Sequence, residues 1–170
     1  RGPATKRPKR FCPDMKAQVF FIPAAANDAA ETLSQKTRDV FLRLGLCDKL
    51  DKEDFVALKI HFGEKFNTGY IRPVWLRDLV HEIGKKTGRA FLTDSNTLYV
   101  GHRSNSVDHI RLAWSHGIRP DVIDAPVIIA DGLIGRDMRE SPGRHGRITS
   151  PKIGSAFLNS DALVCLTHVT

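Results

Sequence analysis

The chain of 170 residues contains few cysteines and no cysteine motif that would hold a metal cluster. Cys12, Cys47 and Cys165 are widely spaced and form no C-x-x-C pair. This excludes a disulfide framework, and it excludes a zinc or [4Fe–4S] site built from this chain's own cysteines. We interpret Cys47 and Cys165 as small buried hydrophobic residues.

Long apolar segments are also missing. No apolar run approaches the roughly 18 residues of a membrane span, and the first ten residues lack the apolar stretch of a signal peptide. Apolar residues make up 41% of the chain and charged residues 26%, which is typical of a soluble globular protein. We therefore expect a cytoplasmic protein without a membrane partner.

The common nucleotide-binding and hydrolase motifs are absent as well. G-L-I-G and G-R-H-G do not follow a strand and open a helix, as a phosphate-binding loop does. There is no G-x-G-x-x-G dinucleotide fingerprint and no G-x-S-x-G nucleophile elbow. The sequence thus gives no support to a nucleotide-dependent enzyme or a serine hydrolase.

The net charge of +7 is concentrated at the N-terminus. Arg1, Lys6, Arg7, Lys9 and Arg10 carry five positive charges without an acid among them, and removing them leaves +2 for residues 11–170. We expect residues 1–14 to be a disordered basic tail that is not native structure, and residues 15–170 to form one domain. This distribution argues against nucleic acid as a partner of the folded part.

Apolar runs alternate with helical periods along the rest of the chain. This pattern predicts an α/β domain with a largely parallel sheet and helices on both faces. We expect the last strand to be buried and the domain to be incomplete at its C-terminus, because the sequence ends directly after that strand. The expected strands are 17–22, 55–62, 90–94, 125–131 and 161–168, the expected helices follow Asp28, Pro73 and Ser106, and a hairpin or excursion precedes a short helix at 153–160.

Polar residues follow the predicted strands at their carboxyl ends, the usual location of ligands in such sheets. His61, Asp94, Asp131 and His168 are therefore candidate catalytic residues, and His61 and His168 are also candidate ligands of a divalent metal. The alternative is structural, because Asp and Asn after strands commonly form turns or cap helices. Candidates for positioning a ligand are Glu64, Asn67, Thr68, Asn96, Arg103 and Asn105, and the same loops contribute Thr97, Asp108 and His109.

Three further histidines and two arginines receive separate interpretations. We expect His81 and His145 to face solvent, and His116 to interact with the C-terminus of its own helix. Arg72 and Arg103, near the starts of helices, are candidates for holding an anionic group.

Several segments resemble the domain-of-unknown-function family 362, the uncharacterised iron–sulfur centre proteins. The segments are VALKIHFGEKFNTGYIRP, FLTDSNTLYVGHRSNSVDH, APVIIADGLIGRD and IGSAFLNSDALVCLTHVT, and the likeness runs from about Met15 to Thr170. The resemblance implies a prokaryotic protein linked to electron transfer, with [4Fe–4S] clusters in a C-terminal ferredoxin-like module. That module is missing from this sequence, so the resemblance implies no cluster bound by this chain.

These observations support two main hypotheses and leave open whether the protein is an enzyme. The first is the N-terminal domain of an iron–sulfur redox protein that binds a metal or a small anionic ligand at the strand ends. The second is a non-catalytic scaffold that docks a ferredoxin-like module or another redox partner. Nucleic-acid binding through the basic tail ranks behind both.

Overall fold

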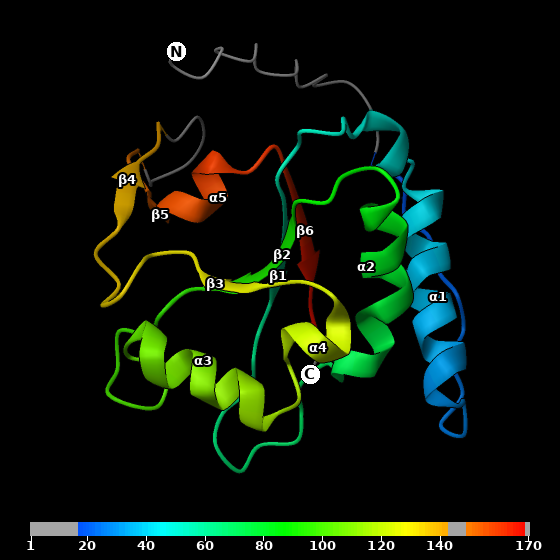
Figure 1. Cartoon of the computed structure of the whole chain (residues 1–170), viewed down its shortest axis with the longest axis horizontal. Helices are drawn as coiled ribbons and strands as arrows, with labels where there is room; N and C mark the ends of the chain where they lie inside the picture. The colour runs from blue at the N-terminus through cyan, green and yellow to red at the C-terminus, as the bar shows by residue number, and fades with distance from the viewer. Residues whose placement is uncertain (1–16, 143–148, 169–170) are drawn as a thin grey trace.

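A four-stranded parallel sheet forms the centre of the molecule (Figure 1). The computed structural model describes residues 17–142 and 149–168. The strand order is β3-β2-β1-β6, and every pairing within this sheet is parallel. The strands are β1 (Val56–Ile60), β2 (Ala90–Asp94), β3 (Val127–Ile129) and β6 (Ala162–Leu166). The prediction of an α/β fold with a largely parallel sheet is therefore confirmed.

Helices lie on both sides of this sheet. Figure 1 shows α1 and α2 side by side on one side, and α5 with a small hairpin on the other. The helical elements are α1 (Ala30–Arg43), the short 3₁₀ turns η1 (Cys47–Lys49) and η2 (Pro73–Leu76), α2 (Arg77–Gly84), α3 (Ser106–Ser115), α4 (Pro120–Ile123) and α5 (Ser155–Asn159). The hairpin consists of β4 (Met138–Glu140) and β5 (Lys152–Gly154), which pair antiparallel. Among the described residues, no helix is long and apolar enough to cross a membrane.

One face of the sheet packs against the helices to form the main core. Val56, Leu58 and Ile60 of β1 are fully buried, and they alternate with residues that point to the other face. From α2, Leu79 and Ile83 contribute equally buried side chains at helical spacing. An apolar interior strand and an amphipathic helix both have clear sequence patterns, and the predictions for β1 and α2 are confirmed.

The order of the strands places a topological switch point between β1 and β6. The chain runs outward from β1 to β2 and then β3, and it returns to pair β6 with the opposite side of β1. In doubly wound sheets the crevice at such a point, at the carboxyl ends of the strands, is the usual ligand site.

Two predictions about strands are wrong. Residues 17–22 form no strand, because Val19 and Phe21 are exposed and the segment pairs with no neighbour in the described chain. Strand β6 exists, but it is an edge strand in the described sheet and is not buried. Leu163 and Cys165 point to an uncovered face, so Cys165 is exposed, whereas Cys47 is buried as predicted.

The helix boundaries are confirmed with two corrections. Asp28 does not cap α1, since its carboxylate accepts a hydrogen bond from the Ala25 N–H and pairs with Lys36. Asn105, not Ser106, caps α3, because its Oδ1 accepts the Asp108 N–H at 3.0 Å. Pro73 occupies the first position of η2, as expected.

Candidate functional site

Because the four strands are parallel, their carboxyl ends lie at one edge of the sheet. His61 follows β1, Asp94 ends β2, Asp131 follows β3 and His168 follows β6. The structure divides these four residues into two regions. His61 and His168 line an open cleft, whereas Asp94 and Asp131 are each 5% exposed and lie within hydrogen-bonded loops.

The first region, the β1–β6 cleft, has a volume of about 320 Å³. It lies at the switch point, because both strands that flank that point contribute lining residues. It is lined by Lys59, His61, Gly69, Tyr70, Ile71, Leu166, Thr167 and His168. Two histidines separated by more than a hundred residues in the sequence therefore meet at one site.

The ring of His61 is oriented by the backbone of its own loop. The Gly63 N–H donates to Nδ1 of His61 at 2.9 Å. Because Nδ1 accepts a hydrogen bond from this N–H, the neutral ring carries its hydrogen on Nε2. Loss of solvent around the ring lowers the pKa of His61 below its usual value, and the charge of Arg103 lowers it further. Near neutral pH, His61 therefore presents an N–H donor.

A stack of aromatic side chains forms one wall of the cleft. The ring of Tyr70 lies parallel to that of His116 at 4.3 Å, and the guanidinium of Arg72 lies 4.6 Å from the Tyr70 centroid. His116 Nδ1 lies 2.7 Å from the Phe62 carbonyl and must donate to it, since a carbonyl oxygen only accepts. The prediction that His116 interacts with its own helix end is confirmed for its backbone, since His116 is the C-cap of α3 and its N–H donates to the Leu112 and Ala113 carbonyls. Its ring, in contrast, anchors the loop after β1.

Gly63 makes this wall possible. Its φ of +90° is a conformation that side chains disfavour. A Cβ at this position would lie 2.7 Å from Nδ1 of His116 and 2.9 Å from Cδ1 of Tyr70. A glycine is therefore required both by the backbone and by the close approach of the two rings.

The second region, the Arg103 network, joins two loops around a buried guanidinium. The Arg103 Nε donates to Oε1 of Glu64 at 2.9 Å, and its Nη2 contacts the same oxygen. The Tyr99 hydroxyl accepts a bond from Nη2 at 2.6 Å and itself donates to Glu64 at 2.5 Å. Burial opposes the charged form of Arg103, but the contacts with Glu64 hold its pKa above the usual value. The charges in this network satisfy one another.

Asp94 connects this network to the cleft. Its Oδ1 accepts the Ser95 N–H at 2.9 Å and lies 3.4 Å from Nζ of Lys59, while Nη1 of Arg103 lies 3.4 Å from Oδ2. Burial raises the pKa of Asp94, but His109, Lys59 and the Ser95 N–H outweigh it and hold the pKa below its ordinary value. Asp94 is therefore a charged counter-ion in the interior.

The sequence pattern assigned His109 to a loop, and the structure corrects this assignment. His109 lies on α3, is fully buried, and packs the edge of Phe62 at 5.3 Å between ring centroids. Its Nε2 is 3.6 Å from Oδ2 of Asp94, too long for a hydrogen bond, and neither ring nitrogen has a hydrogen-bond partner among the described residues. The pattern of apolar and polar residues along the sequence did not predict that His109 is buried.

The other candidates have local structural roles. Asp131 accepts both the backbone and the side-chain N–H groups of Asn96, which fixes the loop after β2 to the loop after β3. Asn67 closes a turn by accepting the Gly69 N–H at 2.5 Å, and Asn105 caps α3. Thr68 is exposed. These contacts are the turn and cap roles that the alternative interpretation expected.

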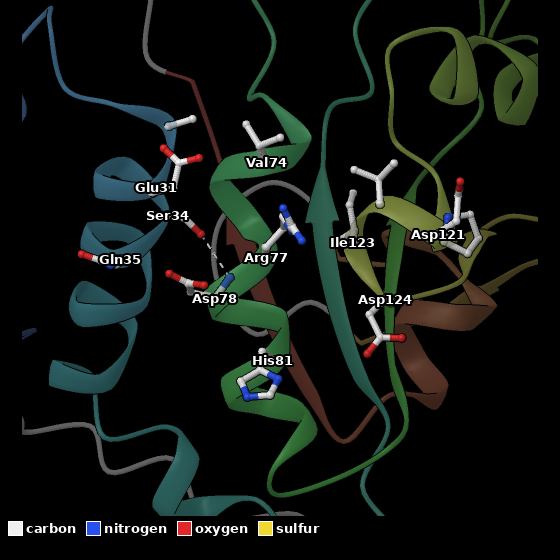
Figure 2. Close-up of a pocket in the computed structure, with 13 residues that line it drawn as sticks. Glu31, Ser34, Gln35, Val74, Arg77, Asp78, His81, Asp121, Ile123 and Asp124 are labelled. Atoms are coloured by element: carbon white, nitrogen blue, oxygen red, sulfur yellow. Dashed lines mark hydrogen bonds between the residues drawn. The ribbon is translucent and has the colours of Figure 1, made fainter.

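A larger hollow of about 590 Å³ lies between α1, α2 and α4 (Figure 2). Figure 2 shows Arg77 projecting from α2 towards Ile123, while the Ser34 hydroxyl accepts the Asp78 N–H at 3.1 Å. The buried polar atoms without partners in the described chain do not line it. Because helix faces carry no local motif, the sequence did not indicate this hollow. It has the larger volume, but the cleft has the more specific arrangement of donors.

The fit of a metal ion to the cleft depends on the histidines. The described residues contain no group of three or more His, Cys, Asp or Glu side chains with the spacing of a metal site. His61 would have to give up its bond from the Gly63 N–H and transfer its hydrogen to Nδ1 before Nε2 could bind a metal. His61 and His168 as metal ligands stay a prediction.

Comparison with known proteins gives one match. A family model described as "Domain of unknown function (DUF362)" matches residues 56–170. No curated protein and no solved structure matches the chain. The matched residues include β1, β6 and the whole lining of the cleft.

Proposed function

The chain belongs to the DUF362 family, and we propose that it binds a small anionic ligand in the β1–β6 cleft. The observation that supports this most directly is the meeting of Lys59, His61 and His168 at the switch point of a parallel sheet. An ammonium group and an imidazole N–H both donate hydrogen bonds and accept none. They therefore suit the oxygen atoms of an anion.

The protein's own groups would hold the ligand from two sides. Lys59 extends from β1 and is partly exposed, and His61 follows it two residues later, so both side chains leave the same side of the strand. His168 and Thr167 lie across the cleft at the end of β6. Asp94 is 3.4 Å from the Lys59 ammonium and restrains its position.

The test is a titration of the protein with acetate and with phosphate, at fixed ionic strength, followed by NMR of the histidine rings. His61 and His168 should shift with one common dissociation constant. His81 is exposed on α2 and lies in the other hollow, so it should not shift and serves as the internal reference. Equal shifts at all three histidines would mean non-specific binding and would overturn the proposal.

A redox role is a separate proposal that rests only on the resemblance to iron–sulfur proteins. The experiment is to express the longest reading frame that contains this sequence, purify the product without oxygen, and measure iron and acid-labile sulfide. About four irons per [4Fe–4S] cluster would support the redox role. A product without iron would remove that role and leave the anion site unaffected.

A docking function is the second candidate, and one group of exposed side chains favours it. Leu98, Val100 and Phe66 are each more than nine-tenths exposed. They lie on neighbouring loops, because Tyr99 donates a hydrogen bond to Glu64. Phe66 also has a φ of +66°, an unfavourable conformation for a bulky residue. If the loops dock a ferredoxin, its addition should broaden the amide signals of residues 98–100 but not those of the exposed Asp48.

A further inference from the structure

We infer that the β1–β6 cleft selects a carboxylate with a small apolar body over a phosphate ester, an inference that rests on the anion site proposed above. The first reason is the amount of positive charge. Among its lining residues, Lys59 is the side chain with a permanent positive charge. Oδ1 of Asp94 is already 3.4 Å from its Nζ, so the ammonium is partly neutralised before a ligand arrives. Such a site balances one negative charge better than two.

The groups that normally bind phosphate are not directed into the cleft. The side chain of Arg103 is 8% exposed, and its donors are taken by Glu64, Asp94 and Tyr99. In the described part of the chain, the cleft is lined by strand and loop residues, without a helix N-terminus. The lining reaches Ile71, directly before the η2 N-cap Arg72, but it does not include the residues of η2 itself. Phosphate sites in α/β proteins ordinarily use the amides of a helix N-terminus or paired arginines.

The available donors correspond to the two oxygens of a carboxylate. Lys59 supplies an ammonium, and His61 supplies one N–H from Nε2 because its Nδ1 accepts the Gly63 N–H. Both residues belong to the end of the same strand. A dianionic phosphoryl group would bring a second negative charge, and the lining holds no second permanently charged side chain to balance it.

Part of the cleft lining is apolar. Ile71 and Leu166 line it and also pack against the main core, and the Tyr70 ring is fixed by its stack on His116. The volume of about 320 Å³ is at the small end of ligand sites. These features suit a short aliphatic or single-ring body attached to the carboxylate.

The experiment compares four probes on the unmodified protein: benzoate, benzenesulfonate, phenyl phosphate and acetate. Dissociation constants come from the shifts of the His61 ring at about pH 7.5, where phenyl phosphate is a dianion. We expect benzoate to bind at least about tenfold more tightly than phenyl phosphate, because the second charge has no counter-ion. Benzenesulfonate should bind between these two, and acetate more weakly than benzoate because it lacks the apolar body.

Matched variants separate the contributions. Lys59→Met should abolish benzoate binding, and Lys59→Arg should retain it, with folding of both checked by circular dichroism. Leu166→Ala should weaken benzoate more than acetate. Phenyl phosphate binding as tightly as benzoate would overturn this inference and leave the anion site intact. If none of the four probes shifts His61, both the inference and the proposed function fail.

Discussion

The two polar regions at the carboxyl edge of the sheet differ in where their side chains find partners. The Arg103 network contains Asp94, Glu64 and Tyr99, and its charges are bound to one another. The β1–β6 cleft contains Lys59, His61 and His168, and its donors face an open volume. The first arrangement stabilises two loops, whereas the second leaves hydrogen-bonding capacity for a ligand. Polar residues at strand ends therefore have to be sorted by whether their partners lie within the protein.

The comparison predicts that the Arg103 network matters mainly for stability. Replacing Arg103 by Met should leave Asp94 with Lys59 as its charged partner and should remove the guanidinium contacts of Glu64, in a largely buried region. We expect a loss of about 3–4 kcal/mol in the free energy of unfolding, measured by urea denaturation. Arg111→Met is the matched control, because its partner Asp108 is 3.7 Å away and both side chains are exposed. The control should change stability by less than about 0.5 kcal/mol. Equal effects of the two substitutions would show that the network is not a structural unit.

A substitution in the wall of the cleft should lower the stability of the protein nearly as much. Gly63→Ala places a methyl group against Tyr70 and His116 and forces a side chain into a positive φ. We expect a loss of about 2–3 kcal/mol, together with a change in the NMR shifts of the His116 ring. Gly84→Ala is the control, since Gly84 lies in α2 with open space around it. That substitution should raise stability by up to about 1 kcal/mol. If Gly63→Ala leaves the free energy of unfolding unchanged, the rings of Tyr70 and His116 can shift to accommodate the methyl group.

The pH dependence of binding distinguishes an anion from a metal. The pKa of His61 is below its usual value in the free protein, so the folded state favours the neutral ring. A bound anion favours the protonated ring, so binding takes up a proton, and affinity for acetate should rise several-fold as the pH falls from about 7.5 to about 5.5. A metal ion competes with protons, and its affinity should fall over the same range. His61→Gln should reduce the pH dependence and leave the contribution of His168, which lines the same cleft. Calorimetry at both pH values measures the change, and a decrease for acetate would contradict the anion site.

The sequence predicted the main features of the fold because they depend on local patterns. β1 and β2 are short apolar runs, and α1 and α2 have apolar residues at helical spacing. The failures depend on distant contacts. Residues 17–22 have the composition of a strand but no partner, and β6 is apolar but lies at an edge of the described sheet.

The sequence predicted which edge of the sheet carries the candidate residues, but it did not predict which side chains contact one another there. The meeting of His61 and His168 follows from parallel strands, and the structure agrees with it. Two facts could not be read from the sequence. One is that Asp94 and Arg103 pair with each other, and the other is that His109 is buried on α3, because both depend on how α3 packs over the strand ends.

The smallest expected effect concerns the loop that borders both regions. Phe66 is exposed and has a positive φ, and Nζ of Lys65 lies 5.2 Å from the centroid of its ring. Asn tolerates this conformation better, so Phe66→Asn should raise the free energy of unfolding by about 0.5–1 kcal/mol. Val74→Asn, at an exposed position in η2 with an ordinary backbone, is the control and should give no gain. If Phe66→Asn stabilises the protein and also weakens ferredoxin binding, the strained aromatic side chain serves an interface. If it stabilises the protein and ferredoxin does not bind either form, the docking role is excluded for that partner and the anion site alone accounts for this edge of the sheet.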